Sequence, residues 1–470
     1  MSTAVHMSVT AQDRRHFWLL MLAALVLLGA GLGLRDPWPS DEPRFTLVAK
    51  QMIASGDWLF PHRGSELYSD KPPMLMWLEA VFYLITGNWR VSFLLPSLLA
   101  GLATLALTWD IGRRLWNPRV GLFAAAMMLL TFQFAYQVKR AQIDPLVMAL
   151  ITLANWGLLI HLLRGPNWRA WWLGCFAAGL GVITKGVGVI ALLMLPPYVA
   201  SRRGAWVGVT LTRADGWRWA RGVFAFFAAI LLWLVPMVTV AFWRGTPEYM
   251  EYVNDMLLHQ TAKRYGGSVG GHAQPFWYFV PVLLFHFFPM SLVYVSTWRE
   301  WRAGWRQKYA RLLLGALFVL CALVFRVRRG VHALAGGIAC FWLVWGFWAS
   351  PLLNDANSAA GVMRKAGAIA GPTAEIGTVG WKEQNLLMAD RPMKYFVFRK
   401  PTELQFGEAV AWQAQAPQTR WLFGLREAVR ACVQRDKVTV VGYANRRQWW
   451  MFRADAVVPG CVPKFEEAED

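Results

Sequence analysis

The fold is decided by the stretch SFLLPSLLAGLATLALTWDI, residues 92–111, which is followed by Arg113 and Arg114. This stretch is long and apolar enough to cross a bilayer as a helix, because about 20 apolar residues span the hydrocarbon core. Arginines next to a span stay on the cytoplasmic side, since Lys and Arg accumulate in cytoplasmic loops. The stretch therefore predicts a membrane span that runs toward the cytoplasm, and it fixes the side on which its neighbours lie.

Similar apolar runs occur on both sides of this span, joined by connections that are mostly short. Of the 470 residues, 56% are hydrophobic and 16% are charged, whereas about 25% of the residues of an average soluble domain are charged. The composition excludes a soluble or intrinsically disordered protein and indicates a polytopic membrane protein. Further spans are expected at residues 17–34, 120–137, 145–163, 171–183, 187–200, 222–243, 276–296 and 330–350.

Two other runs are too short, because a transmembrane helix needs about 17 residues or more. Met74–Thr86 contains Glu79 and is predicted to be an interfacial or re-entrant helix. Leu312–Phe325 is followed by several arginines, and a helix lying in the membrane plane would keep them inside. The alternative is that this second run crosses the membrane and places those arginines outside.

The net charge of +20 lies mostly in the connections between the apolar runs. Such charge attracts anionic lipid and sets the orientation of the spans. The sequence contains no nucleic-acid-binding motif, so membrane lipids are expected as partners and nucleic acid is not. Counting spans from the N-terminus places three segments outside the cytoplasm, at about residues 35–73, 138–144 and 244–275.

The tail has a different character, with short β-like runs at residues 375–381, 420–423, 437–443 and 448–452. Such runs, separated by helical or turn-like pieces, predict a small α/β domain. By the span count it lies outside the cytoplasm, where Cys432 and Cys461 could pair; two separate buried thiols are the alternative. The expected fold is an all-α polytopic membrane domain at 1–350 with a small soluble α/β domain at 351–470.

The first outside segment contains Asp41-Glu42-Pro43-Arg44, two carboxylates beside an arginine just beyond a span. Carboxylates in such a position can act as a general base, or bind a metal or an amine. The alternative is a helix N-terminus, in which Asp41 caps a helix that begins near Pro43. Both can hold at once, because a capped helix fixes the direction of a carboxylate.

The same segment ends with Tyr68, Asp70 and Lys71, directly before the predicted interfacial helix. A lysine at headgroup depth can contact a phosphate as a point charge, or it can simply extend toward the interface. In the second outside segment, Lys139 and Asp144 place a cation and a carboxylate at the mouth of a span. The alternative for Asp144 is a cap before a proline at the start of a helix.

The third outside segment contains Arg264 and His272 among several glycines. A lone histidine is more often structural than a ligand, but His272 lies beside an aromatic entry into a span. Because all three segments are expected on one side of the membrane, the sequence predicts that their polar residues gather on that face.

These residues resemble the GT-C membrane glycosyltransferases of the protein O-mannosyltransferase and undecaprenyl-phosphate aminoarabinose transferase type. The resemblance covers about residues 10–300, and the tail is only loosely similar. It is carried mainly by the order of the motifs in the first outside segment, with weaker matches after it. The matching motifs are Asp41-Glu42-Pro43-Arg44, Gly56-Asp57-Trp58, Asp70-Lys71-Pro72-Pro73 with Trp77, Asp144-Pro145, Thr184-Lys185-Gly186, and His272 before Pro275-Phe276-Trp277-Tyr278.

The resemblance implies a GT-C-like fold in a bacterial inner membrane, with the active site facing the periplasm. It implies transfer of a sugar from a polyprenyl-phosphate donor, without a nucleotide, to a hydroxyl or phosphate of a lipid, glycan or protein. By the same resemblance, Asp41 takes the proton of the acceptor hydroxyl with Glu42 beside it, and Asp144 is the second essential acid.

The resemblance also implies which residues bind substrate and metal. Cations would hold the donor phosphate, as fixed positive charge stabilises a leaving phosphate. One divalent metal ion would be held by Asp70 and His272, with an aspartate here where close relatives often have glutamate. The candidates for substrate binding are Lys71, Arg44, Tyr68, Arg264 and Lys139.

Two alternatives remain at this point. A polyprenyl-lipid transporter or flippase would place ionisable groups near the bilayer midplane, whereas the acidic residues here cluster in loops. Relatives of the GT-C type usually have more spans before the tail domain, so the second alternative is an inactive, shortened paralogue that acts as a scaffold.

Overall fold

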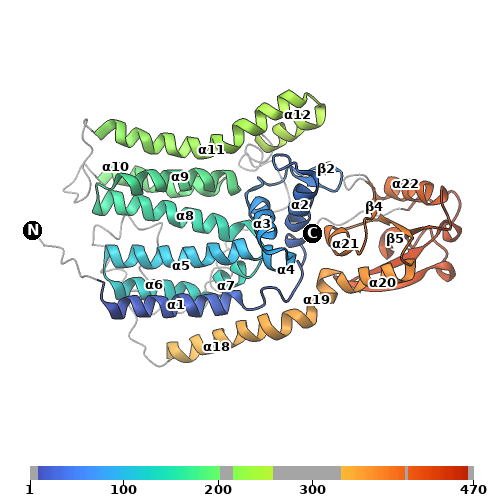
Figure 1. Ribbon diagram of the computed structural model, residues 1–470, viewed down its shortest axis with the longest axis horizontal. Coiled ribbons are helices and arrows are strands. Elements are labelled where there is room, and N and C mark those ends of the chain that lie inside the picture. The colour runs from blue at the N-terminus through green and yellow to red at the C-terminus, as the bar shows by residue number, and fades with distance from the viewer. Residues whose placement is uncertain (1–8, 202–214, 258–329, 397–400, 464–470) are drawn as a thin grey trace, which may run out of the picture. The chain divides into compact units, whose positions relative to one another are not determined.

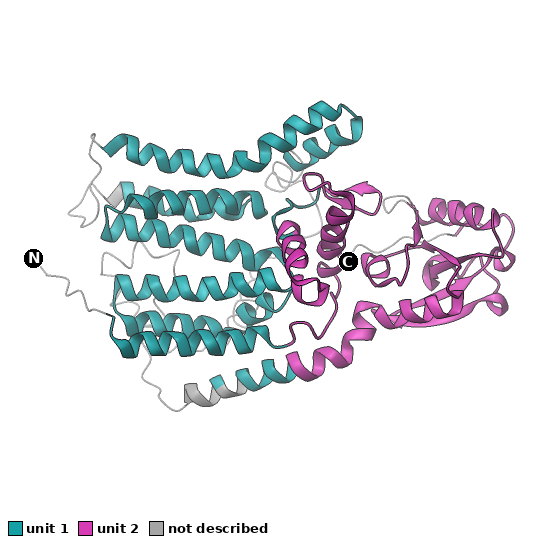
Figure 2. Cartoon of the chain, viewed as in Figure 1, with its two compact units in different colours: residues 1–30, 69–75, 94–345 teal, residues 31–68, 76–93, 346–470 magenta. Residues whose placement is uncertain are grey.

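The computed structural model describes residues 9–201, 215–257, 330–396 and 401–463. The chain forms two compact units, each built from separate segments of the sequence (Figure 2). Unit 1 comprises residues 1–30, 69–75 and 94–345, and unit 2 comprises residues 31–68, 76–93 and 346–470. The expected boundary at residue 350 lies close to the last of these divisions. The first outside segment, however, belongs largely to the same unit as the tail.

Unit 1 is a set of long helices that run side by side (Figure 1). Its described elements are α1 (Ala11–Gly29), α5 (Leu95–Leu115), α6 (Pro118–Leu130), α7 (Phe132–Val138), α8 (Ile143–Leu159), η1 (Ile160–Arg164), α9 (Trp168–Lys185), η2 (Val187–Met194), α10 (Leu195–Ser201), α11 (Gly216–Arg244), α12 (Pro247–Asn254) and α18 (Gly330–Val344). Helix α9 packs between α8 and α11, and α5 packs against α1, α6 and α8.

Among the described residues, three helices are long and apolar enough to cross a membrane: Trp89–Leu115, Ile143–Arg164 and Gly216–Arg244. A fourth span is reached if α6 and α7 count as one, but they are bent by 70°. The span expected at 120–137 therefore corresponds to two apolar helices with a bend between them. Thr131 between the two helices has an extended ψ of 121°, which ends the helical hydrogen bonding.

Other predicted runs differ in their detail. The first begins at Ala11 and ends at Gly29, and the run at 187–200 forms a 3₁₀ helix followed by α10. The run at 330–350 forms α18 and a π-helical turn, η7 (Trp345–Ala349). The predicted span at 276–296 and the predicted in-plane helix at 312–325 lie outside the described residues.

Glycines set the close packing between α8 and α9. A Cβ atom on Gly157 would lie 2.3 Å from the Ala170 carbonyl oxygen and 2.7 Å from the Gly174 Cα. Small residues let helix backbones approach in this way, and they are typical of helix contacts within membranes.

The described part of the tail, in unit 2, combines helices with one sheet. Its elements there are α19 (Ser350–Ser358), α20 (Ala360–Ala370), β3 (Glu375–Val379), α21 (Glu383–Met388), β4 (Lys394–Tyr395), α22 (Thr402–Ala414), β5 (Arg420–Leu425), α23 (Arg426–Val429), η8 (Arg435–Lys437), β6 (Thr439–Ala444), β7 (Arg447–Phe452) and η9 (Ala454–Ala456). The strands form one sheet in the order β4-β3-β5-β7-β6. Strand β3 runs parallel to β4 and β5, and β7 runs antiparallel to β5 and β6. All four predicted strands are present, and β4 is the one that was not predicted.

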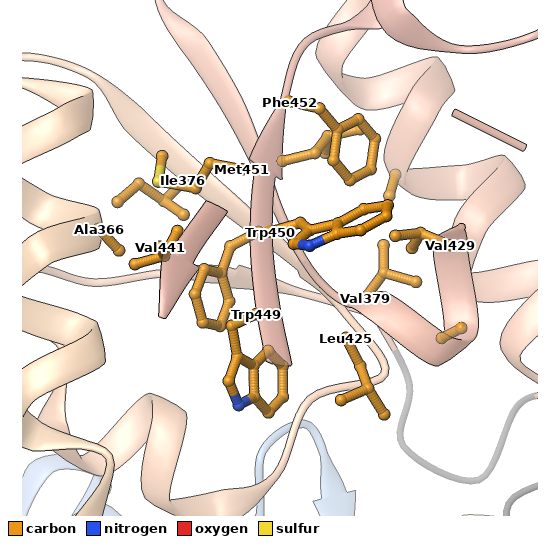
Figure 3. Close-up of a cluster of buried hydrophobic side chains, with 14 of the residues drawn as sticks. Ala366, Ile376, Val379, Leu425, Val429, Val441, Trp449, Trp450, Met451 and Phe452 are labelled. Carbon is orange, nitrogen blue, oxygen red and sulfur yellow. The ribbon is translucent and has the colours of Figure 1, made fainter. Parts of the chain in front are cut away.

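The sheet is held by an aromatic core (Figure 3). Trp449 is 1% exposed, and its ring stacks on that of Phe423 at a centroid distance of 4.8 Å. Phe452 and Met451 on the same strand are fully buried. The last four residues of β7, Trp449 to Phe452, are all buried, so side chains on both faces of the strand are covered, which accounts for its nearly continuous apolar sequence.

Cys432 and Cys461 form a disulfide, so the paired alternative holds. The bond joins the segment after β7 to the segment that follows α23. A backbone bridge between Val433 and Val457 lies beside it. Disulfides persist in oxidising compartments.

The first outside segment contributes α2 (Glu42–Ser55) and a hairpin of β1 (His62–Arg63) and β2 (Glu66–Leu67) to unit 2. Most of α3 (Met74–Thr86) and α4 (Trp89–Ser92), which follow that segment, belong to the same unit. Helix α3 has the predicted bounds. Its Glu79 is fully buried and accepts a hydrogen bond of 3.0 Å from the Thr46 hydroxyl on α2. Burial raises the pKa of the Glu79 carboxyl well above its usual range, which favours the uncharged form.

The close approach of α8 and α9 predicts that Gly157→Ala lowers the stability of unit 1. The added Cβ would overlap backbone atoms that cannot easily move, and overpacking of this kind costs about 1–3 kcal/mol. Thermal unfolding of the purified protein in detergent measures the effect. Gly216→Ala is the matched control, because nothing lies within 4 Å of a Cβ added there. Equal melting temperatures for the Gly157 variant and the wild type would contradict the packing described.

Candidate functional site

A cavity of about 420 Å³ lies in unit 1. Three charged side chains, Asp70, Lys71 and Lys185, contribute to its lining, and most of the remaining wall is apolar. The other lining residues are Pro72, Val182, Ile183, Gly186, Val187, Ile230, Trp233, Leu234, Met256 and Leu257. Two ammonium groups beside a mostly apolar wall are suited to an amphiphile with an anionic head.

Lys185 is placed by the end of α9. Gly186 follows it with a φ of +79°, which a residue with a side chain rarely adopts, and its N–H is bonded to the Val182 carbonyl. A lysine in the last turn of a helix is also favoured by the helix dipole. The Lys185 ammonium donates to a carboxylate oxygen of Asp144 at the start of α8. The pair is partly exposed, with 33% and 46% of the two side chains accessible.

Parts of all three predicted outside segments meet at this cavity. The Ser69 hydroxyl donates to the Asp255 carboxylate at 3.1 Å, which joins the first segment to the third. Residues 70–72 and 256–257 line the same cavity, and Asp144 of the second segment pairs with Lys185. The arrangement is that expected if the three segments share one face of the membrane.

Asp41 lies in unit 2 at the N-cap position of α2, but its side chain makes no capping hydrogen bond. The helix therefore begins where the capping alternative expected, without the carboxylate being used for it. The Arg44 Nη1 atom lies 3.9 Å from the Asp41 Oδ1 atom. The Asp41 side chain is 38% exposed, so it is accessible to a substrate.

Arg44 is held by the tail. Its Nε donates to the Glu383 carboxylate of α21 at 3.1 Å, and the Arg63 guanidinium lies 3.7 Å from the same oxygen. Burial of Arg44 disfavours its charged form, but Glu383, Tyr68 and Asp41 together outweigh this and raise the pKa of Arg44. The guanidinium therefore remains charged beside Asp41.

Glu42, which was predicted to be catalytic, is instead bonded within unit 2. Both of its oxygens are bonded to the Arg35 guanidinium, at 2.5 and 2.7 Å, and one also accepts the Trp38 backbone N–H at 2.8 Å. Its side chain is 1% exposed. A buried, two-pronged ion pair of this kind is a structural contact, and it leaves Glu42 no oxygen turned toward a substrate.

Lys139 also differs from its predicted role in substrate binding. Its ammonium donates to the carbonyl oxygens of Leu27 and Ala30 at 2.8 and 2.7 Å, at the end of α1. The last carbonyls of a helix have no partners within the helix, so a cation that bonds them caps it. Tyr68 is 1% exposed, and its ring lies against the Arg63 guanidinium.

Two further motif residues are structural as well. The Asp57 carboxylate accepts the backbone N–H groups of Leu59 and Phe60 at 3.3 and 3.2 Å. The Trp77 indole donates to the Trp58 carbonyl at 2.6 Å, which holds α3 on the loop before the hairpin.

Two candidates, Arg264 and His272, lie outside the described residues. Within the described ranges, no three His, Cys, Asp or Glu side chains are gathered as a metal site. Asp70, the other predicted metal ligand, lies in the cavity with two lysines.

Asp41 and Arg44 belong to unit 2, whereas Asp144 and Lys71 belong to unit 1. That these groups meet in one chamber stays a prediction. Lys185 was named in the sequence only as part of the Thr184-Lys185-Gly186 motif and was given no role, although a lysine that closes an apolar run before a glycine was a usable signal. It gave no signal for Glu383, whose partners lie more than 300 residues away in the chain.

Residues 70–243 match the family model described as dolichyl-phosphate-mannose-protein mannosyltransferase. The chain is 29% identical, over 326 residues, to undecaprenyl phosphate-alpha-4-amino-4-deoxy-L-arabinose arabinosyl transferase 1 of Pseudomonas fluorescens (strain Pf0-1), covering 68% of this chain and 55% of that protein. It is 27% identical, over 312 residues, to the transferase of that name from Pseudomonas savastanoi pv. phaseolicola, covering 65% and 56%. The chain thus matches little more than half the length of these relatives.

The fold is similar to that of ArnT from Cupriavidus metallidurans, in the crystal structure bound to undecaprenyl phosphate. The TM-score is 0.69 at 18% identity, over 96% of this chain and 100% of that chain. The apo oligosaccharyltransferase of Archaeoglobus fulgidus is also similar, with a TM-score of 0.52 at 11% identity over 88% and 70%. The resemblance to GT-C glycosyltransferases of this type, predicted from the motifs, is confirmed.

The cavity predicts that Lys185→Ala weakens the binding of a phosphate-headed amphiphile, with dodecyl phosphate as the probe. A hydrogen bond to a charged group contributes about 1.5–3 kcal/mol, so we expect a loss of about tenfold or more, measured by isothermal titration. Lys50→Ala removes an exposed lysine of α2 and serves as the control. Unchanged binding by the Lys185 variant would show that this cavity does not hold the anionic head.

Proposed function

We propose that the chain is a glycosyltransferase that moves a sugar from a polyprenyl-phosphate donor to a hydroxyl or phosphate acceptor at the periplasmic face of a bacterial inner membrane. The observation that carries the proposal is the unit 1 cavity, in which Lys71 and Lys185 contribute to a mostly apolar lining and Asp144 pairs with Lys185. All three residues fall within the range matched by the mannosyltransferase family model. The names of the relatives support an undecaprenyl-phosphate sugar as the donor.

The donor would be held by its two chemically different parts. The isoprenoid chain fits the apolar wall formed by residues of α9, η2 and α11, and the phosphate fits the two lysines. When the bond between the sugar and the phosphate breaks, negative charge grows on the leaving phosphate. Fixed ammonium groups stabilise that charge as it forms. Asp144 would orient Lys185 for this task through its ion pair.

The acceptor half of the reaction would use Asp41. An acceptor hydroxyl attacks the anomeric carbon of the sugar, its proton passes to the Asp41 carboxylate, and polyprenyl phosphate leaves. A general base must come within hydrogen-bond reach of that proton, and the partly exposed Asp41 is accessible for this. A phosphate acceptor is already ionised and needs no base, so the dependence on Asp41 separates the two acceptor classes.

The periplasmic orientation rests on two features. Arg113 and Arg114 end the span at Trp89–Leu115, which directs that end toward the cytoplasm. The disulfide of Cys432 and Cys461 suits an oxidising compartment for the tail. Both features favour an active site outside the cytoplasm.

We also propose that one divalent ion could bind, with Asp70 and His272 as ligands. The described residues do not complete such a site by themselves, and no step above depends on it. When bound, such an ion would add positive charge near the donor phosphate.

The transporter alternative has no support in the described residues. Carboxylates at mid-depth in the helical bundle would have favoured it. In the described part of unit 1 no carboxylate is fully buried. The buried carboxylates, all in unit 2, are Asp36, Glu42, Glu79 and Glu383.

Asp41→Asn tests the proposal directly. In proteoliposomes with a radiolabelled polyprenyl-phosphate aminoarabinose donor, we expect transfer to a hydroxyl acceptor to fall by about 10²–10⁴-fold, because a general base contributes that much. Donor binding should be retained, since the lysines are unchanged. Asp436→Asn removes an exposed tail carboxylate and is the control.

Full transfer to a hydroxyl acceptor by the Asp41 variant would remove Asp41 as the base. A wild-type chain that binds the donor but transfers no sugar to any acceptor tested would favour the scaffold alternative.

A further inference from the structure

The segment that carries Asp41 is held by the tail at one end through Asn354 of α19. The Asn354 side chain accepts the Asp36 backbone N–H at 2.7 Å and donates to the Asp36 carboxylate at 2.7 Å. The same carboxylate is bonded by Arg90 at 2.7 and 3.0 Å. Asp36 and Asn354 are both buried. The chain just before Asp41 is therefore fixed to a residue more than 300 positions away.

The second attachment lies after Asp41 and involves Glu383, the first residue of α21. The Glu383 side chain is 5% exposed, and a buried carboxylate needs cationic partners to remain charged. Arg44 supplies one at 3.1 Å and Arg63 another at 3.7 Å. Both arginines come from the first outside segment, so their ion pairs with Glu383 attach this segment to the tail.

The contact with Glu383 also fixes the direction of the Arg44 guanidinium. Its Nε atom faces Glu383, and its Nη1 atom faces Asp41 at 3.9 Å. The guanidinium is planar and rigid, so fixing Nε fixes the other nitrogens. A separation of 3.9 Å is longer than a hydrogen bond. Arg44 is thus near Asp41 without being bonded to it.

We infer that Glu383 is a positioning residue for Asp41: it holds the Arg44 guanidinium by its Nε and so keeps Arg44 from forming a hydrogen bond with the Asp41 carboxylate. The consequence for catalysis rests on the proposed function, in which Asp41 is the base. The positioning itself does not, because it is a property of the fold.

The charged neighbours decide what removal of Glu383 would do. The groups that act on Arg44 are Glu383, Tyr68 and Asp41, and Arg63 also faces Glu383. Glu42 is bonded by Arg35 and cannot replace Glu383 as the partner of Arg44. Apart from Glu383, the carboxylate that acts on Arg44 is Asp41, at 3.9 Å. A hydrogen bond from an arginine stabilises the ionised carboxylate and weakens it as a base.

The direct test measures the protonation of Asp41 without any transfer reaction. The full chain in detergent is treated with a water-soluble carbodiimide and glycine methyl ester over a range of pH, and the modification of Asp41 is quantified by mass spectrometry. Carbodiimide reacts with the protonated carboxyl. In Glu383→Ala we expect the midpoint of modification to move to lower pH by about 1 unit or more, since Arg44 then favours the ionised form.

Two further variants separate the mechanism from a general loss of structure. Glu383→Gln keeps an acceptor for the Arg44 Nε, so it should shift the midpoint less than Glu383→Ala and covers the case in which the alanine variant does not fold. In an Arg44→Ala background the loss of Glu383 should shift the midpoint little, because Glu383 acts through Arg44.

Glu375→Ala is the matched control, because Glu375 is also a tail glutamate paired with an arginine, Arg420, at 2.7 Å. It should leave the midpoint unchanged. An unchanged midpoint in both Glu383 variants, with folded protein, would overturn the inference. Sugar transfer measured on the same variants keeps the two claims apart: a shifted midpoint with an inactive wild type would leave the positioning intact and reject the proposed function.

Discussion

A lysine ammonium in an apolar cavity must be paired or solvated, because an isolated charge is costly to remove from water. Lys185 at the end of α9 is paired with Asp144 at the start of α8, and the pair is partly exposed. The packing of α8 against α9 brings the start of α8 and the end of α9 within reach of each other. The same packing places Lys185 in the lining of the apolar cavity. The proposed binding of a phosphate-headed lipid follows from this one arrangement.

The tail also holds the segment that carries Asp41. It shares a unit with residues 31–68 and 76–93, and its contacts with them are charged and buried. Asn354 holds the chain before Asp41, and Glu383 holds the chain after it. Removing one partner of a buried ion pair leaves an uncompensated charge, so loss of Glu383 is expected to loosen the Asp41 segment.

Much of this fold could be predicted from the sequence, because local patterns determine it. Apolar runs gave the helices of unit 1, and four β-like runs gave four strands of the tail. The bend at Thr131 could not be predicted, since the apolar pattern continues through it. In the site, Lys71 and Asp70 were predicted to be near a ligand and line the cavity. Glu42 and Lys139 were assigned to chemistry because their partners, Arg35 and the end of α1, cannot be seen in the local sequence.

The proposed function requires Asp41 and Asp144 to face one chamber, as the sequence predicts. Cysteine cross-linking tests this requirement, with Asp41→Cys and Asp144→Cys in a background without the free cysteines, and a short bis-maleimide. We expect an intramolecular cross-link between these positions, reduced when a polyprenyl-phosphate sugar is bound, and none between Asp41→Cys and Asp13→Cys. Failure of the first pair to cross-link, with both thiols reactive to a single maleimide, would show that the two residues do not share a chamber.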